Sequence, residues 1–393
     1  MTTAVAWTEL GLVRQLVRFR VVVVLGLACA QAVLDRSAVI LDYGYFAAAG
    51  KVLLSSDALH AFADPAVQSG PFEIGLFGAS DLMSSTTDHL YLALFVEGAL
   101  ALAVMLVLRW MVPGSAGLQL LGGLAVLGVA LPSTALTDGH PAQLVIPLMW
   151  LCSATLAWRH RPAAAGLLLG LSAGWEVWGL LGVPVLLLGA GWRSHATAAT
   201  TAALAVVALF APFLLAGHFN SGDFTWTVHA GSVPSLLMAP GTAFGWPLRV
   251  VQALAAVIAG AVVVRSRRDD PAMAVWSAPM VIIATRLTFE PLATGYYWLA
   301  PQLLGVVGLV VVLANRRRTH LAVAACLPLL AGVLPGAATA ALTAGLLLVG
   351  VRRRSLLTPR LPPAEAPSGS SARDVQVVRP RTPNAATPRR ASR

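Results

Sequence analysis

The sequence predicts an all-α, polytopic membrane protein with about twelve transmembrane passes. Three observations point to this class. Of the 393 residues, 57% are hydrophobic and only 11% are charged, whereas soluble proteins carry about 25% charged residues. Apolar runs near the roughly 20 residues that a transmembrane helix needs recur from residue 21 to residue 351. Basic residues gather at alternate ends of these runs, which is the positive-inside pattern.

The basic residues predict the orientation of the chain. Of the 20 Lys and Arg residues before residue 355, 16 fall at alternate ends of the apolar runs. They are Arg14, Arg18, Arg20, Arg109, Arg159, Arg161, Arg193, Arg265, Arg267, Arg268, Arg316, Arg317, Arg318, Arg352, Arg353 and Arg354. Both termini are therefore expected in the cytoplasm. The formal net charge of +10 then reflects topology and does not indicate nucleic-acid binding.

The predicted elements follow from the apolar runs and their breakers. Ten single spans cover 17–35, 89–109, 114–135, 142–158, 196–216, 245–264, 272–286, 296–313, 320–334 and 336–351. The segment 162–192 has basic clusters on both sides, so both its ends are expected in the cytoplasm. We interpret it as a broken pair of short helices that meet at residues 174–179. This break is a candidate cavity wall, because irregular backbone at membrane depth must be buried or line a wet cavity.

Two regions follow from this division. Residues 1–354 form the membrane domain, with a long first outer loop at 36–88. Residues 355–393 are rich in Pro, Ser, Ala and Arg without an apolar period, and they predict a disordered basic cytoplasmic tail. Its arginines are expected to contact anionic membrane lipids.

The first outer loop is the longest stretch outside the spans that is rich in reactive side chains. The segment from Asp35 to His89 holds seven acids and two bases. Residues 42–54 predict a short amphipathic helix on the membrane surface, with Asp42 at its start. An aspartate there meets the headgroup of a lipid-linked substrate. The alternative is that Asp42 caps its own helix.

A second candidate region lies around Arg286, one of four bases on the outer side. Glu290 and the aromatic run Tyr296-Tyr297-Trp298 follow it. An arginine beside aromatic rings suits a phosphate with a sugar stacked nearby. The alternative is an ion pair with Glu290 and an ordinary aromatic belt.

Two further polar residues need an explanation. Glu176 lies inside an apolar run, where a charge costs about 2.5–3.5 kcal/mol. It either lines a cavity near a phosphate or a metal, or is neutral and hydrogen-bonded in the helix break. His140 ends an Asp-Gly turn, where substrate contact and simple turn formation are both open.

Several segments resemble the GT-C glycosyltransferases, and most closely the bacterial mannosyltransferases that use polyprenol-phosphate-mannose. Residues 42–54, 59–62 and 64–65 resemble the first-loop pattern of that family. Residues 166–176 resemble its Gly-Leu-rich segment, and 295–298 its late outer loop. The motifs are short, and together they span most of the hydrophobic region.

This resemblance implies a GT-C-like fold and an inverting sugar transfer at the outer face of a bacterial plasma membrane. Asp42 matches the aspartate that deprotonates the acceptor hydroxyl while a lipid phosphate leaves. The implied partners are a polyprenyl-phosphate sugar donor and a glycolipid or glycan acceptor. The candidate substrate-binding residues are Lys51, His60, Asp64, His140, Glu176, Arg286, Glu290, Tyr296, Tyr297 and Trp298.

One position departs from the family pattern. Glu176 stands where such enzymes often have a lysine, so the cation that stabilises the leaving phosphate is expected from Arg286, Lys51 or His140. We expect Asp42, His140, Glu176 and Arg286 to border one outward-opening cavity. No Asp-X-Asp motif is present, which favours a lipid-linked donor over a nucleotide sugar.

No cofactor is predicted. A divalent metal is compatible with the chemistry, but no ligand spacing indicates one. The main alternative function is a secondary transporter or flippase, since twelve passes with a broken helix pair also suit that class. A non-catalytic assembly protein is the third.

Overall fold

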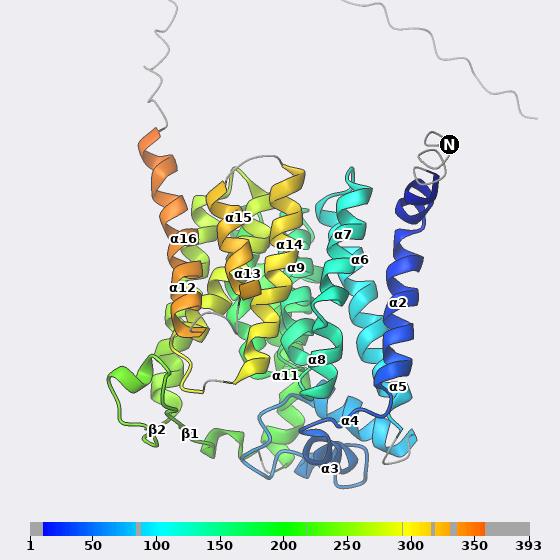
Figure 1. Ribbon diagram of the computed structural model, residues 1–393. Helices are drawn as coiled ribbons and strands as arrows, with labels where there is room; N and C mark the ends of the chain where they lie inside the picture. Colours follow the sequence, from blue (N-terminus) through cyan, green and yellow to red (C-terminus); the bar gives the residue numbers. More distant parts are fainter. Residues whose placement is uncertain are drawn as a thin grey trace, which may run out of the picture.

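The computed structural model describes residues 11–83, 88–217, 219–292, 294–315, 319–330 and 336–357. They form an α-helical bundle with a single two-stranded antiparallel hairpin, in which Trp226 pairs with Phe244 and Thr227 with Ala243 (Figure 1). An all-α class is therefore confirmed for the described part of the chain. The predicted tail lies outside the described residues from residue 358 onward.

The helices and strands follow one another in chain order. After a short helix, Gly11–Arg18, they are α2 (Arg20–Asp35), α3 (Tyr43–Leu53), η1 (Ala58–His60), α4 (Pro71–Met83), α5 (Leu90–Ala93), η2 (Leu94–Gly98), α6 (Ala99–Met111), α7 (Ala116–Gly128), α8 (Leu131–Thr137), α9 (Ala142–Trp158), α10 (Pro162–Ser172), η3 (Val177–Leu188), α11 (Gly191–Ala216), η4 (Ser221–Asp223), β1 (Trp226–Thr227), η5 (Pro234–Leu236), β2 (Ala243–Phe244), α12 (Trp246–Ser266), α13 (Pro271–Thr288), η6 (Gly295–Trp298), α14 (Leu299–Ala314), α15 (Thr319–Cys326), η7 (Leu327–Leu330) and α16 (Gly336–Leu357).

Several helices are suited to cross a membrane. By length and composition, five described helical stretches qualify, or six if Gly11–Arg18 and α2, bent by 80°, count as one span. The five are Leu90–Met111, Ala116–Thr137, Gly191–Ala216, Trp246–Ser266 and Gly295–Ala314. Other predicted passes coincide with shorter apolar helices, including α9, α10 and η3. The chain is thus a helical membrane protein, and length and composition alone support five or six crossings.

The predicted broken pair is present as two short helices. α10 ends at Ser172, and η3, a 3₁₀ helix, begins at Val177. The first turn of η3 is held from inside the bundle, because the Trp150 indole N–H donates to the Gly179 carbonyl at 2.7 Å. Hydrogen bonds of this kind, from a neighbouring helix to exposed backbone groups, permit irregular backbone at membrane depth.

The centre of the bundle is formed by helices that are apolar on every side. Most of α13 is buried, from Met273 to Leu287, and most of α9 and α14 is buried as well. Trp150 of α9 and Trp276 of α13 are fully buried. A helix that is hydrophobic all round belongs in the interior. α13 therefore carries Arg286, near its C-terminus, to the outer edge of the core.

The first outer loop forms a cap across one end of the bundle. α3, α4 and the β hairpin lie at the end opposite to the helix Gly11–Arg18 and the last turn of α16 (Figure 1). α3 and α4 cross closely at Gly50 and Gly78, where an added side chain would overlap the backbone of the other helix. The Lys51 ammonium pairs with the Asp81 carboxylate at 2.6 Å across the same crossing.

Candidate functional site

Asp42 precedes α3 but does not cap it. Within the described residues its side chain makes no capping hydrogen bond to that helix. Its Oδ2 lies 3.0 Å from Nε2 of His140 instead. An ionised carboxylate only accepts hydrogen bonds, so Nε2 is the donor. The Asp42 side chain is 51% exposed and the His140 side chain 10% exposed, so water reaches the carboxylate while the imidazole is covered.

His140 is held in position by the turn between α8 and α9. Gly139 adopts a positive φ of 77°, which glycine tolerates without strain. The His140 ring then stacks on Tyr296, with centroids 3.9 Å apart, and meets the edge of Phe46 at 5.5 Å. Its Nδ1 is buried and has no hydrogen-bond partner among the described residues.

The contact between Asp42 and His140 shifts both groups toward their charged forms. The hydrogen bond from His140 holds the pKa of Asp42 below its usual value, against the opposing effect of partial burial. Burial lowers the pKa of His140, but the hydrogen bond to Asp42 and the nearby Glu73 and Glu176 more than offset this and raise the pKa overall.

Glu73 is a buried acid that the fold places beside Glu176. An antiparallel bridge joins Ser69 to Glu176, and the Phe72 N–H donates to the Gly174 carbonyl at 2.8 Å. The start of α4 is thereby tied to the break between α10 and η3. Glu73 Oε1 accepts the Ala142 N–H at the N-terminus of α9 at 3.2 Å. Burial and then Glu176 raise the pKa of Glu73 to about 8.

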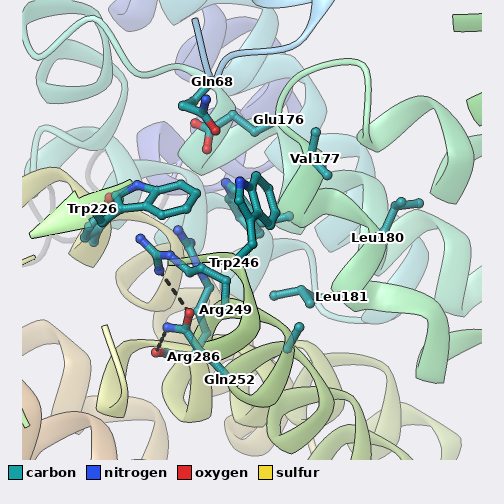
Figure 2. Close-up of a pocket in the computed structure, with 13 residues that line it drawn as sticks. Gln68, Glu176, Val177, Leu180, Leu181, Trp226, Trp246, Arg249, Gln252 and Arg286 are labelled. Atoms are coloured by element: carbon teal, nitrogen blue, oxygen red, sulfur yellow. Dashed lines mark hydrogen bonds between the residues drawn. The ribbon is translucent and has the colours of Figure 1, made fainter. Parts of the chain in front are cut away.

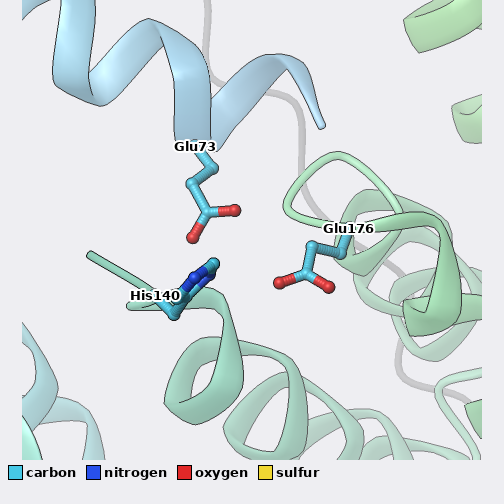
Figure 3. A group of neighbouring side chains, drawn as sticks. All are labelled: Glu73, His140 and Glu176. Carbon is cyan, nitrogen blue, oxygen red and sulfur yellow. The ribbon is translucent and has the colours of Figure 1, made fainter. Parts of the chain in front are cut away.

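Glu73, His140 and Glu176 form a compact cluster. One potential ligand atom from each lies within 4.8 Å of the others. Figure 3 shows both carboxyl groups turned toward the imidazole. Glu176 also accepts a hydrogen bond from Gln143 at 3.0 Å. The donor set of two carboxylates and an imidazole is suited to a divalent metal ion.

A cavity of about 300 Å³ borders this cluster. Figure 2 shows Arg249 and Arg286 below Trp226 and Trp246, with Glu176 and Gln68 at the far side. The complete lining is Gln68, Glu176, Val177, Trp178, Leu180, Leu181, Trp226, Trp246, Arg249, Gln252, Ala253, Arg286 and Tyr297.

The two arginines share one buried carboxylate. Glu290 is 3% exposed and lies 2.8 Å from Nη1 of Arg249 and 3.7 Å from Nε of Arg286. This trio keeps one net positive charge. The guanidinium carbon of Arg249 lies 4.1 Å from the ring centroid of Trp226, and that of Arg286 lies 4.7 Å from Trp178. The cavity therefore presents positive charge and aromatic faces together.

An apolar hollow of about 370 Å³ adjoins the cavity. The two share Gln68, Val177, Leu180 and Trp246 in their linings. The hollow extends along α11, where Phe210 and the 59%-exposed Leu214 contribute to its wall. Leu214 belongs to a helix long and apolar enough to cross a membrane.

The structure brings together part of the predicted site. Glu176, Arg286 and Tyr297 line the cavity, and Glu290 lies beneath its arginines. The expectation that Asp42 and His140 also border it is wrong. Tyr296 stacks on the His140 ring. His140 and the cavity are connected by Glu176, which lies in the same cluster as His140 and also lines the cavity.

The other predicted residues lie elsewhere. Lys51 is paired with Asp81 on the α3–α4 crossing. Asp64 accepts the Ala66 N–H at 2.9 Å within its own turn. His60 is exposed at the end of η1, and Trp298 packs against the core.

Among the site residues that were not predicted are Glu73, Arg249, Trp226 and Trp246. Glu73 was counted only among the loop acids. Arg249 was counted only among the outer bases. Its position at the start of an apolar run, after Gly245-Trp246-Pro247, could have indicated a site residue at the outer end of a span. Trp226 and Trp246 flank the outer loop whose ends pair as β1 and β2, a pairing that the sequence does not indicate.

No protein-family model, no curated protein and no solved structure matches this chain. The function is therefore inferred from the geometry of the site.

Proposed function

We propose that this protein is a membrane-embedded, inverting glycosyltransferase. It moves a sugar, mannose by the resemblance, from a polyprenyl-phosphate donor to a glycolipid or glycan acceptor at the outer face of a bacterial plasma membrane. One observation carries the proposal. A cavity with two arginines and three indole rings continues into an apolar hollow along α11.

The cavity suits the polar part of such a donor. Guanidinium groups bind phosphate through paired hydrogen bonds, and Arg249, Arg286 and Glu290 together keep one positive charge for an anion. Trp178, Trp226 and Trp246 offer flat apolar surfaces for the faces of a sugar ring. A volume of about 300 Å³ is at the lower end of small-ligand pockets.

The adjoining hollow suits the isoprenoid part. Its lining includes Phe62, Phe210, Leu214 and Phe219, and apolar surface favours an alkyl chain over water. A donor that enters from the bilayer beside α11 would keep its chain in this hollow while its phosphate reaches the arginines. A nucleotide sugar has no alkyl chain that could fill the apolar hollow.

Asp42 is the general base in this proposal. The base must be ionised and must reach the acceptor hydroxyl within about 3 Å. Asp42 meets the first condition through its hydrogen bond to His140. Its half-exposed carboxylate is open to an acceptor that approaches from the aqueous side. Because Asp42 does not line the arginine cavity, the proposal requires the donor sugar to extend from that cavity past Glu176 toward Asp42.

The proposed topology has twelve passes with both termini in the cytoplasm. Shorter apolar helices, among them α9, α10 and η3, lie at several of the passes that length alone does not support. The loop cap and the described chain ends lie at opposite ends of the bundle (Figure 1). Transporter sites tend to lie near the midplane, whereas Asp42 and His140 belong to the outer cap.

The test is transfer of radiolabelled mannose from polyprenyl phosphate by membranes that contain the protein. Asp42→Asn is expected to lower transfer at least about 100-fold at equal protein amount. Asp57→Asn is the matched control, because Asp57 is an exposed acid of the same loop, and it is expected to transfer at the wild-type rate. Equal transfer by Asp42→Asn, or uptake of substrate without transfer by the wild type, would contradict the proposal.

A further inference from the structure

The cluster of Glu73, His140 and Glu176 contains more buried acceptor atoms than donors to satisfy them. Glu73 is fully buried and its Oε2 has no partner among the described residues, and the same holds for Nδ1 of His140. Buried polar atoms are normally hydrogen-bonded. Two buried atoms without hydrogen-bond partners, beside a second carboxylate, are suited to bind a cation.

The hydrogen bonds around the cluster leave those atoms free. Asp42 accepts a hydrogen bond from Nε2 of His140, so the Nδ1 lone pair of the neutral imidazole is available to a metal ion. The Ala142 N–H donates a hydrogen bond to Oε1 of Glu73. Oε2 of Glu73 has no hydrogen-bond partner among the described residues. A histidine that binds a metal almost always donates its other N–H to a carboxylate or carbonyl oxygen, which is the arrangement between His140 and Asp42.

We propose that Glu73, His140 and Glu176 bind one divalent transition-metal ion, Mn²⁺ or Zn²⁺, with Asp42 as the carboxylate that orients the histidine. An imidazole together with two carboxylates favours these ions over Mg²⁺ and Ca²⁺, which prefer oxygen ligands alone. Cis or tetrahedral ligand atoms that share one ion at about 2.1 Å lie about 3.0–3.4 Å apart. The three candidate atoms lie within 4.8 Å of one another, so binding requires side-chain movements of up to about 1.5 Å.

The backbone explains how the site is held. The bridge from Ser69 to Glu176 and the turn at Gly139 fix the three segments that supply the ligands. Glu176 also belongs to the lining of the arginine cavity. A bound ion would therefore lie at the edge of that cavity, beside any anion held by Arg286. The inference is independent of the proposed sugar transfer, because metal binding is measured without a substrate.

The test measures metal bound to the purified, tag-free full chain in detergent. After chelation and dialysis against Mn²⁺ or Zn²⁺ alone, elemental analysis is expected to give about one ion per chain for the wild type. Glu73→Gln and Glu176→Gln are expected to lose this ion. Asp42→Asn is expected to retain the ligands but to bind about 10- to 100-fold more weakly.

Glu97→Gln is the matched control, since Glu97 is a fully buried acid of the segment η2, outside the cluster. It is expected to bind like the wild type. Thermal unfolding without metal shows whether each variant is folded. Should Glu73→Gln fail to fold, Glu176→Gln decides, because Glu176 is only half-buried. The absence of a saturable ion in the wild type, or full binding by folded Glu176→Gln, would overturn the proposal.

Discussion

Ser69 and Glu176 form an antiparallel bridge that joins the first outer loop to the break between α10 and η3. This pairing decides where Glu73 lies, because Glu73 is in the first turn of α4, only a few residues after Ser69. The acid that the sequence places in a solvated loop is consequently buried against the membrane bundle. The cluster of Glu73, His140 and Glu176 depends on this one backbone contact.

Gly70→Ala is expected to weaken that contact. A methyl group at residue 70 would overlap the carbonyl of Gly174, and overpacking costs about 1–3 kcal/mol. Thermal unfolding in detergent should show a lower transition temperature together with loss of the bound metal. Gly75→Ala, in the helix α4 that follows Gly70, meets only a flexible Leu53 side chain at 3.5 Å and should behave like the wild type. A similar effect of both substitutions would argue against a specific role of the bridge.

Arg249→Met is expected to destabilise the protein by about 3–5 kcal/mol, because it leaves Glu290 buried without its closer partner. The Arg249 contact of 2.8 Å is lost, and only Arg286 at 3.7 Å remains. Adding Glu290→Gln should recover much of the loss, because the uncompensated charge is then gone. Unfolding free energies of the two single variants and the double variant provide the measurement. Additive effects would show that the two residues do not interact energetically.

Trp226→Ala is expected to raise the KM for the lipid donor about tenfold, with a smaller change in kcat. The substitution removes the ring over Arg249, at 4.1 Å, and a cation–π contact contributes about 0.5–2 kcal/mol. Initial rates at varied donor concentration separate the two parameters. Trp192→Ala is the control, because Trp192 is 74% exposed at the start of α11. An unchanged KM for Trp226→Ala would place the donor elsewhere.

His140→Phe is expected to lower kcat about 100-fold, because it keeps a ring to stack on Tyr296 while Asp42 loses its donor. The KM for the donor should change less, since His140 does not line the arginine cavity. The control is His195→Phe, whose ring nitrogen contacts the Gly189 carbonyl at the start of α11. A full-rate His140→Phe variant would remove the positioning role.

Single cysteines test the proposed orientation. Ser55→Cys lies in the outer cap and Gly114→Cys between α6 and α7, and both positions are exposed. In intact cells a membrane-impermeant maleimide is expected to label only the first, and both after permeabilisation. The native Cys29, Cys152 and Cys326 lie partly buried in the helices, and their labelling is measured in the parent protein. Labelling of Gly114→Cys from outside would reverse or refute the orientation.

The helical segments were largely predictable from the sequence. The predicted spans 142–158 and 196–216 coincide with α9 and most of α11, because apolar runs and basic ends are local properties. The surface helix after Asp42 was predicted for the same reason and is α3. The break around Glu176 was found because Gly and Trp residues interrupt an apolar run.

The site was predictable only in part. Arg286 and Glu290 were found because they lie four residues apart, within reach of one helical turn. The role of Arg249 depends on α12 packing beside α13, which places Arg249 against Glu290. The contact from Asp42 to His140 joins residues 98 positions apart, and no local pattern of either segment indicates it.

The sequence by itself determined that the chain is a helical membrane protein, and it indicated which loop carries the reactive acids, because hydropathy and charge act residue by residue. Only the tertiary structure decided which acids meet. Glu73 is buried and Asp42 bonds to His140 because distant backbone segments pair and stack, and those pairings depend on the packing of the whole bundle.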